Sequence, residues 1–342
     1  MIRILSVCLW FTASCWSATL RPSHEQLTIL SETVDYIFTD RFQQAYGSCD
    51  QLNDTIPGQP IYHLLYATIL HAEMLDAEEY SRGKILLAHI DSSIKILKDW
   101  TNENPDDPWG YFFLGSAYGY KATWHGQKKS WLKSLIDGLK ARGKFAKALK
   151  IDSTLYDIYT GIGNYHYWSS AKLGKYIPFL PDNRNKGLEE LKLAVDSSLF
   201  SNKPAALGLA WALIHEKQLS RAARIGRQLY EETSGGRASL WILGGAYWRV
   251  GNLRDAERYY GELIESLEQA GEQNYYNLIF CHYRRGVCLF GMRKHELAKR
   301  EFEGLISYDV SKEVARRHKR TYKKTREYIE KLKERSSYPR EP

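Results

Sequence analysis

The chain has 342 residues and a formal net charge of +8, and 44% of its residues are hydrophobic and 26% charged. This balance is typical of a globular protein and excludes an intrinsically disordered chain. Most of the positive charge lies in the C-terminal segment Ser311–Pro342, which carries twelve Lys or Arg and five Glu. Because the rest of the chain is close to neutral, we expect no nucleic-acid partner.

Residues 1–18 predict an export signal peptide. Arg3 supplies the positive start, Ile4–Phe11 forms a short apolar run, and mostly small residues follow up to Ala18. The apolar run is shorter than the roughly 20 residues of a membrane-spanning helix. One expected outcome is therefore simple cleavage near Ala18 and release of a periplasmic protein.

The same segment leaves a second outcome open. Phe11–Cys15 resembles a bacterial lipobox, in which the cysteine becomes the lipidated first residue. Lipidation of Cys15 would tether the protein to the membrane. We expect an exported protein that is periplasmic or lipid-anchored to the outer membrane.

Residues 24–103 predict an N-terminal helix over His24–Ala45, followed by a degenerate helical hairpin over Ile61–Trp100.

After residue 18 the chain has three cysteines, Cys49, Cys281 and Cys288. The last two lie seven positions apart on one predicted helix, about 10.5 Å along its axis, which is too far for a disulfide. Since none has metal-ligand spacing, we predict buried thiols and no metal site.

The segment LGGAYWRVGNLRDAERYYGEL, Leu243–Leu263, predicts a helical hairpin. Apolar and small residues recur at helical spacing on both sides of Gly251. Gly244 and Ala256 lie twelve positions apart, where small side chains let two antiparallel helices approach closely. A phosphate-binding loop would need a preceding strand and a Gly-x-Gly-x-x-Gly pattern, and the segment has neither. The small residues are therefore predicted to be contacts between helices.

The same pattern recurs along residues 109–311. Ala222 and Ala256 are 34 positions apart, and Ala256 and Ala298 are 42 apart. At these positions the chain resembles the tetratricopeptide repeat (TPR), whose unit has 34 residues. More loosely, it resembles uncharacterised exported bacterial TPR proteins. The resemblance implies an all-α, right-handed solenoid of about six TPR-like hairpins.

Two neighbouring hairpins carry long inserts, near residues 119–138 and 167–186. Both inserts are rich in Trp, Tyr and Lys, and insertions on one edge of a solenoid often serve binding. The predicted insert contacts are Trp124, Lys128, Trp131, Lys172, Lys175 and Tyr176.

The TPR resemblance also implies a concave groove, lined by the first helix of each hairpin. Large aromatic residues with a polar tip occupy many of these positions, as in binding hot spots. The predicted groove residues are Trp109, Phe112, Tyr120, Asn164, Tyr167, Trp168, Trp211, Trp241, Trp248 and Arg249, with His215, Tyr283 and Phe290 completing the row. The alternative is that the inserts fold back and bury this row as extra core.

Catalytic and cofactor motifs are weak. Gly138–Lys144 has the spacing of a nucleotide loop, but Phe145 stands where Ser or Thr must hold magnesium. The ten histidines show no ligand spacing. We expect no catalytic residues, no metal and no cofactor.

The segment 312–342 predicts a basic C-terminal capping helix and tail, since a solenoid needs a polar cap. The alternative for this tail is contact with anionic lipid. The sequence thus predicts a non-enzymatic scaffold of the bacterial periplasm or cell envelope that binds a protein or peptide. The alternative is an envelope glycan-binding or glycan-cleaving enzyme, which would need two convergent carboxylates in the groove.

Overall fold

The computed structural model describes residues 19–55, 60–173, 181–270 and 274–337. These residues form helices and turns, with no strand among them. In chain order the helices are α1 (His24–Phe38), α2 (Phe42–Thr55), α3 (Pro60–Ala77), α4 (Gly83–Glu103), α5 (Pro108–Gln127), α6 (Trp131–Ile151), α7 (Ile158–Leu173), α8 (Arg184–Ser197), α9 (Asn202–His215), α10 (Leu219–Glu232), α11 (Arg237–Val250), α12 (Leu253–Gln269), α13 (Tyr275–Gly291), α14 (His295–Ser307), α15 (Lys312–Arg317) and α16 (Lys319–Ser337).

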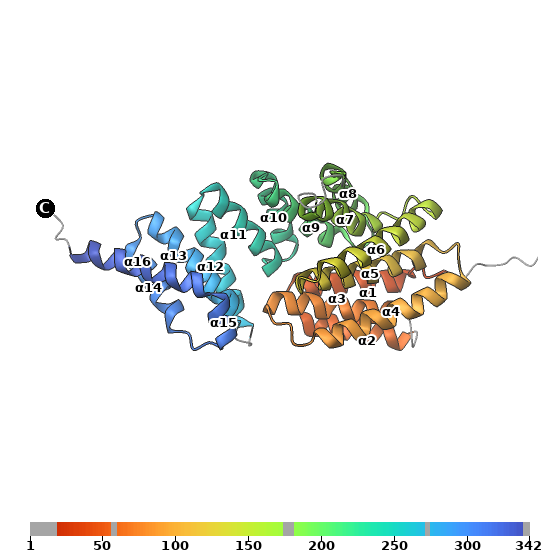
Figure 1. The fold of residues 1–342 in the computed structure, drawn as a ribbon, viewed down its shortest axis with the longest axis horizontal. Helices are drawn as coiled ribbons and strands as arrows, with labels where there is room; N and C mark the ends of the chain where they lie inside the picture. The colour runs from red at the N-terminus through yellow and green to blue at the C-terminus, as the bar shows by residue number, and fades with distance from the viewer. Residues whose placement is uncertain (1–18, 56–59, 174–180, 271–273, 338–342) are drawn as a thin grey trace, which may run out of the picture.

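Helices α1 to α14 pair in sequence order into seven helical hairpins within the described residues. The first helices of successive hairpins contact one another from α1 through α11 and form one layer of a solenoid. Figure 1 shows the hairpins following one another from the α1–α6 group, through α7–α10, to α11–α16. The prediction of an all-α solenoid of TPR-like hairpins is confirmed.

The number of hairpins exceeds the expected six because residues 24–45 do not form one helix. The chain turns at Thr39–Arg41, where Asp40 has a φ of 61°, in the left-handed region. A residue in that conformation ends a helix, so α1 and α2 become a hairpin of their own. This hairpin packs on α3.

Small residues set the closest helix contacts. A Cβ added at Gly187 of α8 would lie 2.7 Å from the Gly163 carbonyl oxygen of α7, so the two backbones nearly touch. In the segment 243–263, a Cβ at Gly244 would lie 3.2 Å from the Tyr260 ring. Gly251, with a φ of 83°, ends α11 in the left-handed region that glycine adopts without strain. The prediction that these small residues serve helix contacts and turns is confirmed.

The first insert lengthens its hairpin. Helices α5 and α6 have 20 and 21 residues, whereas α9, α10 and α11 have 14 each. The second insert extends α7 to Leu173 and includes the connection to α8. Residues 174–180 of that connection lie outside the described part of the chain.

The first two hairpins also contact the solenoid far along the chain. The buried guanidinium of Arg237, at the start of α11, binds both carboxylate oxygens of Asp76 at 2.8 and 2.6 Å. The Arg237 backbone N–H donates to Asp40 at 2.8 Å. Asn274 and Asn277, at the start of α13, both donate to the Asp76 carbonyl oxygen at 2.8 Å. The turn after α3 is therefore fixed to two later hairpins.

The C-terminal helix α16 covers the end of the last hairpin. Its Tyr328 stacks on Phe302 of α14 with ring centroids 5.1 Å apart, and Leu332 and Thr325 are buried. The charged residues of α16 lie on its other faces, as a solenoid cap requires.

Cys49, Cys281 and Cys288 are free and buried, as predicted. Among the described helices, none has the length and hydropathy needed to span a membrane.

Candidate binding site

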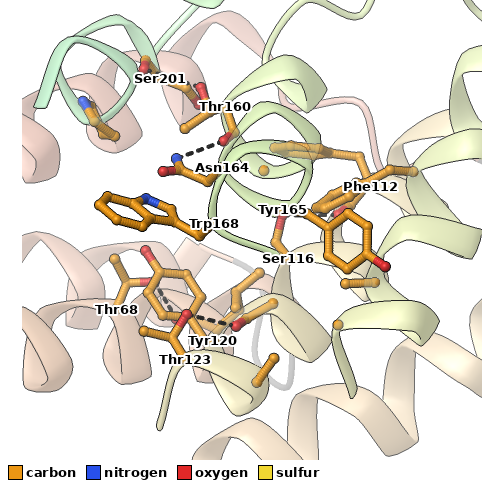
Figure 2. A pocket seen from close by; sticks show the side chains of 18 of the residues that line it. Thr68, Phe112, Ser116, Tyr120, Thr123, Thr160, Asn164, Tyr165, Trp168 and Ser201 are labelled. Carbon is orange, nitrogen blue, oxygen red and sulfur yellow. Dashed lines mark hydrogen bonds between the residues drawn. The ribbon is translucent and has the colours of Figure 1, made fainter. Parts of the chain in front are cut away.

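A cavity of about 730 Å³ lies between α3, α5, α6 and α7, and we call it the inner cavity. Residues of α1 and of the start of α9 complete its walls. Its volume is in the range of sites that bind small molecules or peptide side chains. Figure 2 shows side chains from these helices converging on it.

Helix α5 supplies one wall through the row Phe112, Ser116, Tyr120 and Thr123, whose spacing places them on one helix face. The Tyr120 hydroxyl shares a hydrogen bond with Thr68 of α3. Burial raises the pKa of Tyr120, and the bond to Thr68 opposes this rise. The phenol is therefore neutral at physiological pH.

Helix α7 supplies the facing wall through Thr160, Asn164, Tyr165 and Trp168 (Figure 2). Asn164 donates its side-chain N–H to the Thr160 carbonyl oxygen at 2.8 Å. The described residues give Asn164 no other side-chain hydrogen bond. Its amide packs on Gly208 of α9, where an added Cβ would lie 2.8 Å from Nδ2 and 2.9 Å from Oδ1, so a ligand can reach the oxygen and the second N–H from the cavity side. The half-buried Trp168 offers an aromatic surface beside this amide.

Helix α6 closes the third side. Its Phe145 ring fits between two glycines, since a Cβ at Gly115 or Gly161 would lie 2.7 or 2.5 Å from the ring. The glycines let the α5–α6 hairpin and α7 approach around one phenyl group. Trp131 lines the cavity at the opposite end of α6.

The lining is nearly uncharged. Among the described residues, Asp157 and Lys172 are the charged groups that line it. The buried Asp157 carboxylate accepts the backbone N–H groups of Leu199, Phe200 and Ser201 at 2.9, 3.1 and 3.0 Å, so it holds the entry to α9. Lys172 lies 5.1 Å from the centre of the Trp168 ring. The described lining therefore lacks the two convergent carboxylates of a glycosidase.

Four predicted groove residues meet at this cavity: Phe112, Tyr120, Asn164 and Trp168. Trp131 and Lys172, predicted as insert contacts, also line it. The first helices of two adjacent hairpins and their lengthened ends thus build one site.

Three other predicted contacts are buried packing residues, which corrects the expectation that they meet a partner. Trp109 packs edge-on against Phe112 at 5.7 Å. Tyr167 is fully buried, and its hydroxyl donates to the Ala212 carbonyl oxygen at 3.0 Å. Trp124 occupies the space beside Gly83 of α4, where a Cβ would lie 2.1 Å from its ring. Contacts between hairpins bury Tyr167 and Trp124, and Trp109 is buried among aromatic rings of its own helix α5.

The remaining predicted groove residues lie elsewhere. Trp211, Trp241 and Trp248 are partly buried against the core of α9–α13, and Arg284 lies 4.4 Å over the Trp248 ring. The exposed Arg249 donates to the Gly245 carbonyl oxygen at 2.9 Å. Lys128 lies 4.6 Å from the Trp124 ring centre. His215 is exposed, Tyr283 and Phe290 pack on the C-terminal core, and Lys175, Tyr176 and Cys15 lie outside the described residues.

Sequence reasoning missed Thr68, Ser116, Thr123 and Tyr165. Thr123 lies three positions after Tyr120, so a predicted continuation of the first helix into the insert would have found it. Thr68 belongs to a hairpin whose repeat pattern is degenerate, and no spacing signal marks it. Among the described residues, no three His, Cys, Asp or Glu side chains are placed to hold a metal.

Helical hairpins stack in sequence order, and small residues lie where their helices cross. The chain is therefore a TPR-like α-solenoid. No family model and no curated protein matches the chain. Among solved structures, it is similar to PilW, described as a widely conserved type IV pilus biogenesis factor, at 16% identity and a TM-score of 0.45, covering 70% of this chain and 93% of that one.

Two further solved structures are TPR proteins. One is the C-terminal part of a TPR repeat-containing protein from Cytophaga hutchinsonii, with 16% identity, a TM-score of 0.46 and coverage of 83% and 97% of the two chains. The other comes from Parabacteroides merdae, with 15% identity, a TM-score of 0.38 and coverage of 87% and 98%.

Proposed function

We propose that the chain is a non-catalytic scaffold that holds an apolar segment of a partner protein or peptide in the inner cavity. The observation that carries this proposal is the cavity itself, about 730 Å³ of largely apolar space between α3, α5, α6 and α7. Apolar side chains that enter it leave water, which contributes about 25 cal/mol per Å² buried.

The polar groups of the walls support a peptide as the ligand. Asn164 offers an amide oxygen and an N–H side by side, which matches the donor and acceptor of a peptide backbone. Trp168 and Tyr165 provide flat, half-buried rings, and such residues dominate the binding energy of protein interfaces. Among the described lining residues Asp157 is the one carboxylate, and it is already bonded to three backbone N–H groups, which favours binding over glycoside cleavage in this cavity.

The experiment crosslinks from the rim of the cavity. A photoreactive p-benzoylphenylalanine replaces the exposed Lys172 in the producing cells, and the crosslinked segment is identified by mass spectrometry. The corresponding synthetic peptide is then titrated against the purified chain by calorimetry. We expect one apolar segment to crosslink and to bind in the micromolar range.

A matched pair of variants tests the location. A Cβ added at Gly119, in the cavity wall, or at Gly304, on α14, meets nothing within 4 Å. Gly119→Leu therefore adds an apolar side chain to the cavity wall at a position where its Cβ has room, and Gly304→Leu adds the same group elsewhere. We expect Gly119→Leu to lower the affinity for the peptide at least about tenfold and Gly304→Leu to leave that affinity unchanged. Equal affinity of both variants would exclude the cavity.

We also propose that the scaffold acts in the bacterial cell envelope after export. The support is the signal-like segment 1–18, which lies outside the described residues. Cell fractionation of the native chain and of Cys15→Ser distinguishes the two routes. A tethered protein moves from the membrane fraction to the periplasm on this change, and a cleaved one does not. Recovery of both in the cytoplasm would contradict export.

A further inference from the structure

Helix α6 presents apolar residues to solvent. Leu132, Ile136 and Leu139 are 70%, 45% and 48% exposed. Their spacing of four and three residues places them on one helix face. Trp131, 52% exposed, adds an aromatic ring at the start of the helix. We call these four residues the α6 stripe.

The α6 stripe is additional to the face by which α6 packs in the solenoid. That packing face consists of Gly138, Ala141, Phe145 and Ala148, which are buried against α5 and α7. The outward face of a surface helix is usually polar, because only one face meets the core. The fold therefore gives no reason for large apolar side chains on the outward face of α6.

Positive charge borders the α6 stripe. Helix α6 has six basic residues and one acidic residue, and Lys133, Arg142 and Lys150 are exposed beside or beyond the stripe. Lys147 instead donates to the Tyr111 hydroxyl of α5 at 2.5 Å. The acid, Asp137, is buried, where Lys140 lies 3.3 Å from its carboxylate. An exposed apolar stripe with a basic border is the pattern of a helix that lies in a membrane interface.

We propose that the α6 stripe docks on the surface of a bilayer that contains anionic phospholipid. The apolar side chains enter the boundary between headgroups and acyl chains, and the lysines and arginine contact the phosphates. A second copy of the chain fits less well, since a two-fold contact of this face would oppose two helices of the same charge. A bilayer offers apolar and anionic partners together. The stripe shares Trp131 with the lining of the inner cavity, whereas Leu132, Ile136 and Leu139 lie outside that lining.

Vesicle co-sedimentation of the full chain tests the docking. The probes are vesicles of phosphatidylcholine alone and of phosphatidylcholine with 30% phosphatidylglycerol. The variants are Leu132→Gln/Leu139→Gln, with Leu199→Gln/Leu297→Gln as the control at exposed leucines on other elements. Since residues 1–18 are common to all chains, their contribution to binding cancels. Circular dichroism and thermal unfolding establish that each variant is folded.

We expect the native chain to bind the anionic vesicles, the stripe variant to bind about tenfold more weakly, and the control to bind like the native chain. Lys133→Gln/Lys150→Gln is expected to weaken binding to the anionic vesicles alone. Equal binding by stripe and control variants would overturn the proposal. So would a dimer in sedimentation velocity without lipid that the stripe variant abolishes, because the stripe would then be a contact between copies.

Discussion

Arg237 and Asp76 lie 161 positions apart in the chain and form a bidentate ion pair, with Nε–Oδ1 and Nη2–Oδ2 distances of 2.8 and 2.6 Å. The Arg237 side chain is buried, and Ser266 accepts a further hydrogen bond from its Nη1 at 3.2 Å. The pair joins the end of α3 to the start of α11. Repeats that are remote along the solenoid are therefore in direct contact.

Arg237→Ala should destabilise the protein by about 3 to 5 kcal/mol, because it leaves the Asp76 carboxylate without its buried partner. The measurement is unfolding by urea, monitored by circular dichroism. Lys299→Ala is the control, since Lys299 and Glu303 form an exposed pair at 3.9 Å, and such pairs contribute little. A loss below about 1 kcal/mol for Arg237→Ala would show that the long-range contact is not structural.

Asp40→Asn should stabilise the protein at neutral pH. Burial raises the pKa of Asp40 from 3.8 to about 6, against the opposing charge of Arg237. Between pH 4 and pH 6 the folded protein holds a proton on Asp40 that the unfolded chain has released. The free energy of unfolding therefore has its full contribution from Asp40 below about pH 4, and this contribution is lost as the pH rises through 6. We expect a gain of about 1 to 3 kcal/mol at pH 7 and none at pH 4. A stability difference between Asp40→Asn and the native chain that does not vary with pH would contradict the raised pKa of Asp40.

Gly187→Ala should destabilise the protein by roughly 2 to 3 kcal/mol, because its Cβ would meet backbone atoms at 2.7 Å that cannot give way cheaply. Gly143→Ala, on the exposed side of α6, should instead stabilise by about 0.5 to 1 kcal/mol, since its Cβ meets nothing and alanine favours the helix. Thermal unfolding of both variants measures the change in stability relative to the native chain. A change of the same sign for both variants would refute the close approach of α7 and α8.

The described cysteines should resist alkylation. Burial raises the pKa of Cys49 and of Cys288 to about 12, and the pKa of Cys281 also rises well above its ordinary value. Because the thiolate is the reactive form, iodoacetamide at pH 8 should modify these three only after unfolding in guanidinium. Peptide mass spectrometry follows each site apart from Cys8 and Cys15. Rapid modification of Cys281 in the folded chain would place it at the surface.

The spacing of apolar and small residues in 243–263 was enough to predict the hairpin. Gly244 is needed for a close helix contact and Gly251 for a left-handed turn, and both needs are local. The break at Asp40 was not predictable in this way, since an aspartate in the left-handed conformation leaves no spacing signal. The solenoid class therefore followed from the sequence, while the first hairpin did not.

The site was predictable in part for a similar reason. Helical position identified Phe112 and Asn164 as groove residues, but it could not separate Trp168 from Tyr167. One of these rings faces the inner cavity, and the other packs beneath α9. That difference depends on how α7 packs against α9, a contact between hairpins that helical position alone does not reveal.

The docking of the α3 turn onto α11, α13 and α15 changes how this solenoid can come apart. An open repeat array frays from both ends, because each unit touches only its neighbours. Here Arg317 of α15 also binds the Glu78 carbonyl oxygen at 3.1 Å, so the N-terminal hairpins are held at a second point. We therefore expect loss of structure to begin at the C-terminal helix, and we expect the amide hydrogens of the first hairpins to exchange as slowly as those in the middle of the molecule.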